Sequence, residues 1–114
     1  MDAEVVFKAL GDATRLRIFA LLKEEELCVC EIEEGLSLSQ PNASRHLAVM
    51  KNAGIIQVRR SAQKTYCKIS TEFVKEYPFL LRELNMIADA LPTSNADRIA
   101  LQQFRSQKRV HYGF

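Results

Sequence analysis

The sequence lacks a long hydrophobic run. Its longest aliphatic block covers residues 18–22 (IFALL), which is far too short to span a bilayer. A secretory signal, with a basic start and an apolar core, is also absent. A chain of 114 residues has room for one domain with a modest core but not for a large buried pocket. We therefore expect a soluble, cytoplasmic protein with no membrane partner.

Cysteine is scarce, and signals for catalysis are missing. The three cysteines are an odd number, which argues against a disulfide framework and favours free thiols or metal ligands. There is no glycine-rich nucleotide-binding loop, and no third catalytic group accompanies the pair Cys28 and Cys30. These absences predict that the protein is not an enzyme and uses no organic cofactor.

Acidic residues are absent from residues 39–70. The whole chain has a formal charge of only +2, so the rest of the chain is net −4 once the six basic residues of this segment are set aside. Those residues are Arg45, Lys51, Arg59, Arg60, Lys64 and Lys68. A positive field this concentrated suits a polyanion and predicts binding to double-stranded DNA. The alternative, a solvated charged surface, leaves the lack of any acid unexplained.

The same segment predicts a helix followed by a hairpin. Ser39 is a good N-cap, Pro41 is tolerated in a first turn, and Gly54 suits the left-handed conformation past a helix end. The apolar residues between them recur at i, i+4 and i+7, namely Ala43, Leu47 and Met50. Two strands and the hairpin tip between them are predicted at residues 55–58, 65–69 and 59–64. This order is typical of a recognition helix and a wing.

Helices are predicted on both sides of this segment. Those before it cover residues 1–10, 13–25 and 29–36, and a two-residue turn joins the last of them to the recognition helix, as in a helix-turn-helix. After it we expect a helical turn at 71–76 and a long helix from Pro78. The predicted fold class is mainly α with a small β-hairpin, a winged helix-turn-helix over residues 1–92. Residues 93–114 are expected to form a basic C-terminal tail or a short helix.

The helix from Pro78 has an apolar stripe. It consists of Leu80, Leu84, Ile87 and Leu91. A domain this small already has enough core, so the stripe predicts a homodimer that forms through the terminal helices. DNA geometry points the same way, because two half-sites need two recognition helices. The alternative is that the stripe packs on its own domain, and both can hold for different sides of the helix.

The outward face of the recognition helix supplies candidates for base contacts. Its side chains are small or form hydrogen bonds, as a major groove requires, and Arg45 is the strongest candidate. His46 lies at the edge of the buried stripe, so packing against the next helix explains it at least as well as a DNA contact. The candidates for DNA binding are Ser39, Gln40, Asn42, Ser44, Arg45, His46, Arg59, Arg60 and Lys64.

Three stretches carry a family resemblance. They are GDATRLRIFALL at 11–22, ELCVCEIEEGLSLSQPNASRHLAVMKNAGII at 26–56 and RRSAQKTYCKIS at 59–70. They resemble the ArsR/SmtB family of winged-helix repressors, and ELCVC is closest to the arsenic-responsive members. The resemblance implies a homodimer on a two-fold operator, released by a metal, a metalloid or, in some members, an oxidant. The terminal-helix zinc or nickel site of other members would need a cluster that is absent, since Asp89 stands alone and His111 lies in the tail.

Cys28 and Cys30 form the candidate inducer site. The buried stripe of their helix belongs to Val29, so we expect both thiols to lie off it, where thiolates select soft ions such as trivalent arsenic or antimony. Residues i and i+2 of a regular helix point about 200° apart, so binding is expected to unwind or tilt the first turn. The same pair could instead sense oxidants or reactive sulfur species.

The sequence leaves open which group would be the third ligand of a bound arsenic or antimony ion. The arsenic sensors have a CVCxxC pattern, and here the third position is Glu33. Trivalent arsenic and antimony favour three sulfurs, so the third donor is Cys67, a small external thiol or nothing. We expect the wing to lie well away from Cys28, which favours core packing for Cys67.

Overall fold

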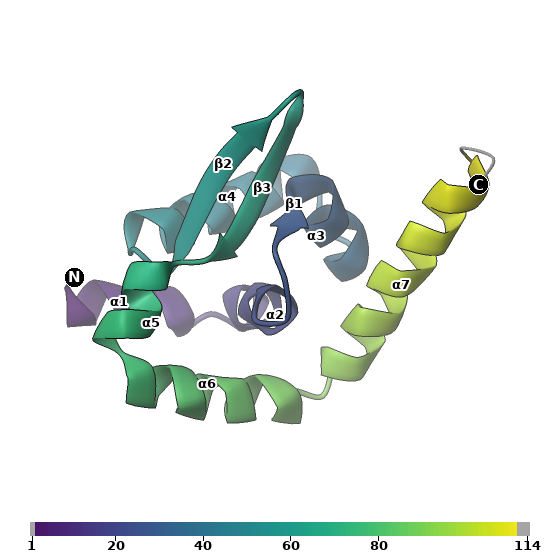
Figure 1. The fold of residues 1–114 in the computed structure, drawn as a ribbon. Coiled ribbons are helices and arrows are strands. Elements are labelled where there is room, and N and C mark those ends of the chain that lie inside the picture. The colour runs from purple at the N-terminus through teal and green to yellow at the C-terminus, as the bar shows by residue number, and fades with distance from the viewer. Residues whose placement is uncertain (1, 112–114) are drawn as a thin grey trace.

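The computed structural model describes the backbone of residues 2–111 and the side chains of residues 2–107. The elements are α1 (Ala3–Leu10), α2 (Ala13–Leu22), β1 (Leu27–Cys28), α3 (Val29–Leu36), α4 (Gln40–Asn52), β2 (Ile56–Ser61), β3 (Lys64–Ile69), α5 (Thr71–Glu76), α6 (Pro78–Ala90) and α7 (Ser94–His111). Figure 1 shows the hairpin β2–β3 standing above the helices, with α7 at one end of the molecule. The predicted winged helix-turn-helix is confirmed.

Side-chain caps set where the helices begin. The capping oxygens belong to Asp12 for α2, Ser39 for α4 and Ser70 for α5, and they accept backbone N–H bonds from Arg15, Asn42 and Phe73. Such a cap contributes about 1 kcal/mol to stability. At its other end α2 stops at Leu22, three residues before the predicted end. Three glutamates follow at residues 24–26, and negative charge is unfavourable at a helix C-terminus.

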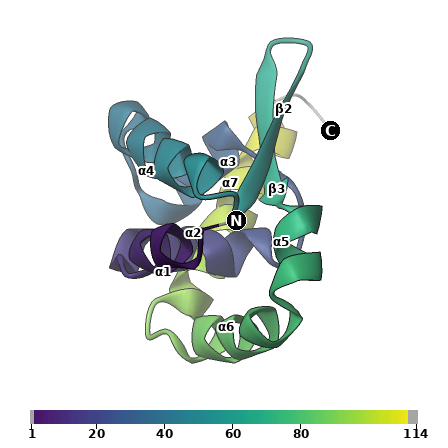
Figure 2. The same cartoon turned by 90° about the vertical axis from the view of Figure 1, so that its left-hand side faces the viewer.

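Helices α3 and α4 form the predicted helix-turn-helix. Helix α3 ends in the left-handed residue Ser37, at φ 55°, and α4 begins three residues later. The predicted inner face of α4 is buried, because Ala43, Leu47 and Met50 are at most 6% exposed. In Figure 2, α4 and the hairpin stand beside one another above α1 and α2. Gly54 adopts the left-handed conformation predicted for it, at φ 82°.

The sheet contains a strand that the sequence did not predict. Strand β1 has only two residues and pairs with β3 in an antiparallel sheet of order β1-β3-β2. In this register Leu27 lies opposite Cys67 and Cys28 lies opposite Tyr66. The expectation that the wing lies well away from Cys28 was therefore wrong. Two residues between a glutamate run and a helix give no period-2 pattern, so no sequence signal marks this strand.

The wing is a longer ladder with a tighter turn than predicted. Strands β2 and β3 pair from Ile56 with Ile69 to Ser61 with Lys64, so only residues 62 and 63 form the turn. Ala62 takes a left-handed conformation there, at φ 56°. The predicted tip at 59–64 was too wide, because charged residues on an exposed ladder need no apolar neighbours to keep their backbone hydrogen bonds. Arg59 and Arg60 consequently lie within β2 rather than at the tip.

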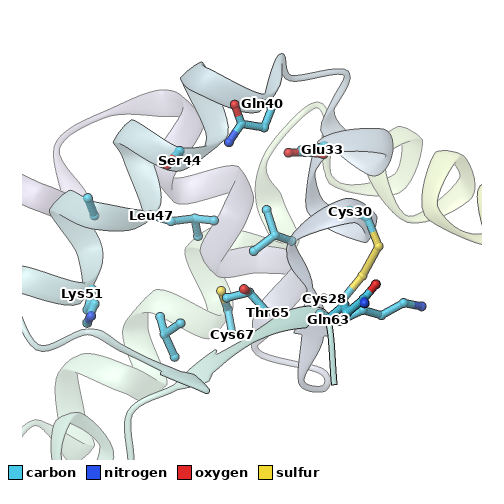
Figure 3. A pocket seen from close by; sticks show the side chains of 14 residues that line it. Cys28, Cys30, Glu33, Gln40, Ser44, Leu47, Lys51, Gln63, Thr65 and Cys67 are labelled. Atoms are coloured by element: carbon cyan, nitrogen blue, oxygen red, sulfur yellow. A yellow bond between two sulfur atoms is a disulfide. The ribbon is translucent and has the colours of Figure 1, made fainter. Parts of the chain in front are cut away.

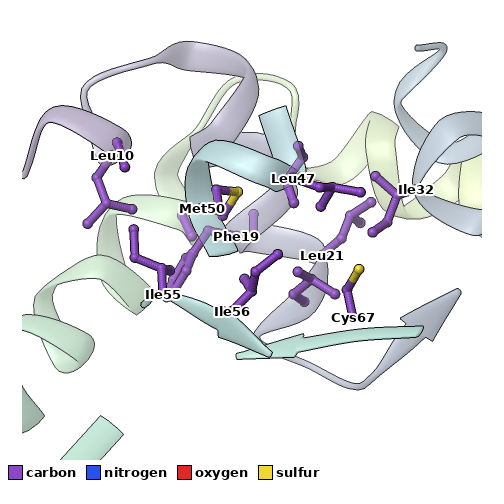
Figure 4. Packing of buried hydrophobic residues seen from close by; sticks show 14 of the residues in the cluster. Leu10, Phe19, Leu21, Ile32, Leu47, Met50, Ile55, Ile56 and Cys67 are labelled. Atoms are coloured by element: carbon purple, nitrogen blue, oxygen red, sulfur yellow. The ribbon is translucent and has the colours of Figure 1, made fainter. Parts of the chain in front are cut away.

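The core is built around α2. Its residues 18–22 are all at most 3% exposed, which confirms the central position expected for this helix. Figure 4 shows side chains of α2, α3, α4 and the wing meeting around Phe19, which is fully buried. Each large apolar side chain buried in this way contributes about 1.5–3 kcal/mol. Cys67 is part of this cluster at 1% exposed.

The apolar stripe of α6 is divided between the core and the surface. Leu84 is only 5% exposed within its own chain, and Leu80 and Leu91 pack partly against the same core. Ile87, the remaining stripe residue, is 48% exposed, and outside the stripe α6 exposes Phe79 at 82% and Met86 at 62%. The alternative that most of the stripe packs on its own domain therefore describes this helix better.

Helix α7 is longer than the tail or short helix expected after residue 92. It has 18 residues and packs along α3, while residues 112–114 lie outside the described residues. Asp97 is buried near its start, and both carboxylate oxygens accept hydrogen bonds from Arg17, at 2.9 and 3.0 Å. This hydrogen bond raises the pKa of Arg17. The helix has few apolar residues, so its order depends on such polar anchors, which sequence periodicity does not reveal. The boundary after residue 92 stays a prediction.

Candidate cysteine site and DNA-binding surface

Cys28 and Cys30 lie at the junction of β1 and α3. Residues 28–31 are called the cysteine turn below. Cys28 has an extended backbone, at φ −77° and ψ 156°, and is the N-cap of α3, whereas Cys30 lies in the first helical turn. Their Cα atoms are 5.4 Å apart, and the two sulfurs form a disulfide (Figure 3). The premise behind the expected unwinding, that both cysteines lie in a regular helix, was wrong, because Cys28 precedes α3 and its side chain reaches Cys30 while the helix is intact.

The two cysteines differ in exposure. Cys28 is only 3% exposed, which contradicts the expectation that both thiols lie off the buried side, and Cys30 is half-buried. The reason is β1, which places Cys28 within the sheet instead of on the helix surface. The backbone N–H of Cys28 donates to Glu31 Oε1 at 2.9 Å, so a carboxylate also fixes the start of the helix.

A groove opens beside the cysteine turn. It holds about 520 Å³ and lies between the start of α3, the outer face of α4 and the inner face of the wing. Figure 3 shows Cys28 and Cys30 at one side of it and Gln40 and Ser44 of α4 at another. Lys64 of the wing lines it too. Residues predicted to bind an inducer and residues predicted to bind DNA therefore border one space.

Cys67 also lines this groove, but it belongs to the core. It is 1% exposed, and burial raises the pKa of its thiol to about 11, with the charge of Glu26 acting in the same direction. Among the described residues, no group of three or more His, Cys, Asp or Glu side chains is placed to hold one metal ion. The structure thus brings Cys28 and Cys30 together and leaves Cys67 outside any three-ligand cluster.

Comparison with known proteins places the chain in a family. Residues 12–58 match the profile of the bacterial regulatory protein, arsR family. The solved structure of reduced HlyU from Vibrio cholerae is 36% identical, covers 72% of this chain and 86% of that chain, and gives a TM-score of 0.62. The chain belongs to the arsR family. The homodimeric winged helix-turn-helix domain of Mb0332 from Mycobacterium bovis, described as a possible ArsR-family regulator, is 30% identical over 75% of this chain and 77% of that one, with a TM-score of 0.63.

A curated relative within the arsR family is named for arsenic. The arsenic resistance transcriptional regulator ArsR1 of Pseudomonas putida is 49% identical over 69 residues, which are 60% of this chain and 54% of the relative. The chain thus spans about half the length of that relative. None of the helices in residues 2–111 is both long and apolar enough to cross a membrane.

On α4, the predicted recognition helix, most predicted DNA-binding residues face outward. Gln40, Ser44 and Arg45 are exposed, and the guanidinium of Arg45 donates to Asn42 Oδ1 at 2.5 Å. The hydroxyl of Ser39 is engaged as the N-cap. The outer face of α4 therefore presents Arg45 together with neighbouring polar side chains.

His46 points away from this face. Its Nδ1 lies 3.1 Å from Arg15 Nη1 and 3.8 Å from the carboxylate of Asp12, and its side chain is 13% exposed. Asp12 has a lowered pKa: burial opposes the shift, but the backbone N–H and the charge of Arg15 outweigh it. These contacts fit the alternative of a structural histidine that joins α4 to α2. Arg15 is the partner that sequence reasoning missed.

Arg59 is tied back to the loop before β1. It donates to both carboxylate oxygens of Glu26, at 3.0 and 2.6 Å, and its guanidinium lies 4.6 Å from the ring centre of Tyr66. Hydrogen bonding between Arg59 and Glu26 lowers the pKa of Glu26 and raises the pKa of Arg59. Arg60, by contrast, points outward from β2 and is exposed. A DNA phosphate would have to compete with Glu26 for Arg59.

The thiol of Cys67 should resist alkylation in the folded, reduced protein. Because its pKa is about 11, its thiolate fraction at pH 8 is about one in a thousand, and burial slows access further. After reduction, iodoacetamide should modify the half-buried Cys30 first, and Cys67 only in denaturant. Peptide mass spectrometry distinguishes the three sites. Labelling of Cys67 as fast as Cys30 would contradict its burial.

Proposed function

We propose that this chain is a cytoplasmic transcriptional repressor that binds operator DNA as a homodimer. In this proposal a thiophilic metalloid or metal, arsenite or antimonite first, binds Cys28 and Cys30 and releases the DNA. The observation that carries it is the position of the two cysteines. They lie side by side at the start of the first helix of the helix-turn-helix and border the groove next to the outer face of α4.

DNA binding is supported by the exposed polar face of α4 and by the basic wing. Arg45 is placed to read a base edge or a phosphate from the recognition helix, whereas Arg60 is placed to contact a phosphate from the wing. The proposed contacts further include Ser39, Gln40, Asn42, Ser44, Arg59 and Lys64. His46 supports this surface through α2 instead of touching DNA.

Dimerisation is supported by exposed apolar side chains on two helices. Phe7 of α1 is 59% exposed, and α6 exposes Phe79 and Met86. Aromatic and methionine side chains at such exposure are typical of a protein–protein contact. We therefore assign the dimer contact to this outer side of α1 and α6 and not to Leu84. The domain of Mb0332, which is described as homodimeric, supports this assembly.

The soft-ion response follows from two neighbouring thiols. Reduction of the disulfide frees two sulfurs that approach each other without unwinding α3, and thiolates select arsenic, antimony or cadmium over hard ions. A third donor would come from outside the protein, such as a small thiol, because the turn itself supplies only two. Release then requires that the ion binds the DNA-free shape more tightly than the DNA-bound shape.

A second candidate function is redox sensing by the same pair. The disulfide between Cys28 and Cys30 favours it. One thiolate attacks hydrogen peroxide, which releases hydroxide and leaves a sulfenic acid; the second thiol then attacks that sulfur, and water leaves as the disulfide forms. Peroxide is reduced to water in this sequence, and the two sulfurs are oxidised. The disulfide form would be the state released from DNA.

The wing and the recognition helix should contribute differently to DNA affinity. Arg45→Ala should lower affinity for the operator more than for random DNA, because it removes a contact with a base. Arg60→Ala should lower affinity for both and reduce the salt dependence by about one unit of slope, as the loss of one phosphate contact does. Fluorescence anisotropy at several salt concentrations measures both, with the exposed Lys75→Ala on α5 as a control for charge. Equal losses on both DNAs for Arg45→Ala would remove it from base recognition.

Phe79→Glu should dissociate the dimer without unfolding the chain. The side chain is 82% exposed within one protomer, so a glutamate costs little there but would be desolvated in the contact. Sedimentation should show a folded monomer for this variant. Ile99→Glu on α7, at a side chain that is 45% exposed, should stay dimeric. Dissociation by Ile99→Glu alone would place the contact on α7.

Cys28→Ser and Cys30→Ser should each keep DNA binding and lose the response to arsenite. Serine is a favourable N-cap, so the helix start at residue 28 survives, but one remaining thiolate cannot hold the ion at two points. Cys67→Ser should keep most of the response. Operator release by arsenite, antimonite, cadmium and peroxide, titrated in parallel, is the measurement. If arsenite releases the double Cys28→Ser, Cys30→Ser variant from DNA, the proposed site is refuted. If peroxide alone releases the wild type from DNA, the redox function is favoured.

A further inference from the structure

The cysteine turn is connected to the C-terminal helix through one carboxylate. Glu31 Oε1 accepts the backbone N–H of Cys28 at 2.9 Å, and Glu31 Oε2 accepts Arg105 Nε at 2.6 Å. A terminal nitrogen of the same arginine donates to Glu25. These hydrogen bonds raise the pKa of Arg105, the one to Glu25 most. Arg105 thus joins the two flanks of the segment 25–31, which carries both cysteines.

Helix α7 is seated so that Arg105 reaches this place. Near its start, Asp97 is held by Arg17 of α2; one helical turn later, Leu101 lies against Gly35 of α3. A Cβ at Gly35 would lie 3.4 Å from the Cβ of Leu101, which is van der Waals contact, so the two helices pack against each other at this point. Because Leu101 meets the end of α3 and Arg105 meets its beginning, the two helices run antiparallel. Each further turn of α7 therefore moves toward the cysteines.

We propose that Arg105 is a positioning residue that holds the cysteine turn in the shape in which the two sulfurs are neighbours. This inference rests on the proposed function, because it concerns how readily the same pair forms a disulfide or binds a two-point ligand. Closing a ring through two thiols is favoured when the chain between them is already ordered. Arg105 orders it by fixing Glu31, whose other oxygen fixes the N–H of Cys28.

Charge gives a second reason for this role. Glu25 and Glu31 would repel each other and their neighbours Glu33 and Glu34 if no cation lay between them. Without Arg105, the carboxylate of Glu31 would gain by turning toward solvent, and the Cys28 N–H would lose its acceptor. The pair of Arg105 and Glu31 is partly shielded from water, at 37% and 17% side-chain exposure, so its effect is larger than that of a fully exposed ion pair.

Exchange with dithiothreitol tests the proposal without DNA. In this reaction dithiothreitol is oxidised to its cyclic disulfide while the Cys28–Cys30 disulfide is reduced to two thiols. Arg105→Ala should shift this equilibrium toward the dithiol by about threefold to tenfold, and the arsenite needed for half release should rise by a similar factor. Arg105→Lys should recover part of both. The matched control is Arg98→Ala, which removes an arginine of α7 that lies 3.9 Å from Asp89, away from the turn.

Glu31→Gln separates positioning from the docking of α7. Its amide oxygen can still accept the Cys28 N–H, while its lost charge weakens the contact with Arg105, so it should shift the exchange in the same direction with an unchanged thermal unfolding midpoint. If Arg105→Ala and Glu31→Gln leave the exchange equilibrium within twofold of Arg98→Ala, the positioning role is wrong. If the wild type keeps its DNA in both arsenite and peroxide, the proposed function fails, and the exchange equilibrium still decides the role of Arg105.

Discussion

The pairing of β1 with β3 is the interaction on which the site depends. Two residues, Leu27 and Cys28, add a third strand to the wing and end where α3 begins. Without this pairing Cys28 would lie on a loop, and the wing would lose its third strand while still packing against α2, α3 and α4. With it, the cysteine turn has the wing on one side and the helix-turn-helix on the other. In the proposed function, a change at the turn would therefore act on both elements that are proposed to contact DNA.

Charged residues from several elements meet around this junction. Six of the 14 acidic residues flank the cysteines, at residues 24–26 and at 31, 33 and 34, where they oppose thiolate formation. Two arginines from distant elements neutralise three of them: Arg59 of the wing pairs with Glu26, and Arg105 of α7 pairs with Glu25 and Glu31. The basic segment thus has two uses, since Arg60 is exposed and Lys64 lines the groove, while Arg59 ties the wing to Glu26, just before the cysteine turn. The excess of basic residues in segment 39–70 predicted a DNA-binding surface, but it could not show which arginine pairs with a glutamate of the same chain.

The helices followed from the sequence because their signals are local. Caps such as Asp12 and Ser39, and apolar periodicity such as Ala43, Leu47 and Met50, lie within a few residues of the structure they specify. What could not be predicted depends on partners distant in sequence. The strand β1 exists because β3 offers an edge, α7 is held by Arg17 and Glu31, and Cys28 leaves the helix because Leu27 before it is paired. The assumed regular helix through both cysteines was a local inference that a long-range contact overturned.

The position of Cys28, at the junction of a strand and a helix, lets the distance between the two sulfurs change. Its sulfur and that of Cys30 can be two free thiols, a disulfide, or two ligands of one ion, and each state sets a different distance between them. In a continuous helix such differences would be opposed by several backbone hydrogen bonds. At a strand–helix junction, the backbone angles of one or two residues can take up such differences. In the proposed function, a change of state at the sulfurs would therefore alter the angle between the wing and the helix-turn-helix, and a DNA duplex that touches both elements would be sensitive to that angle.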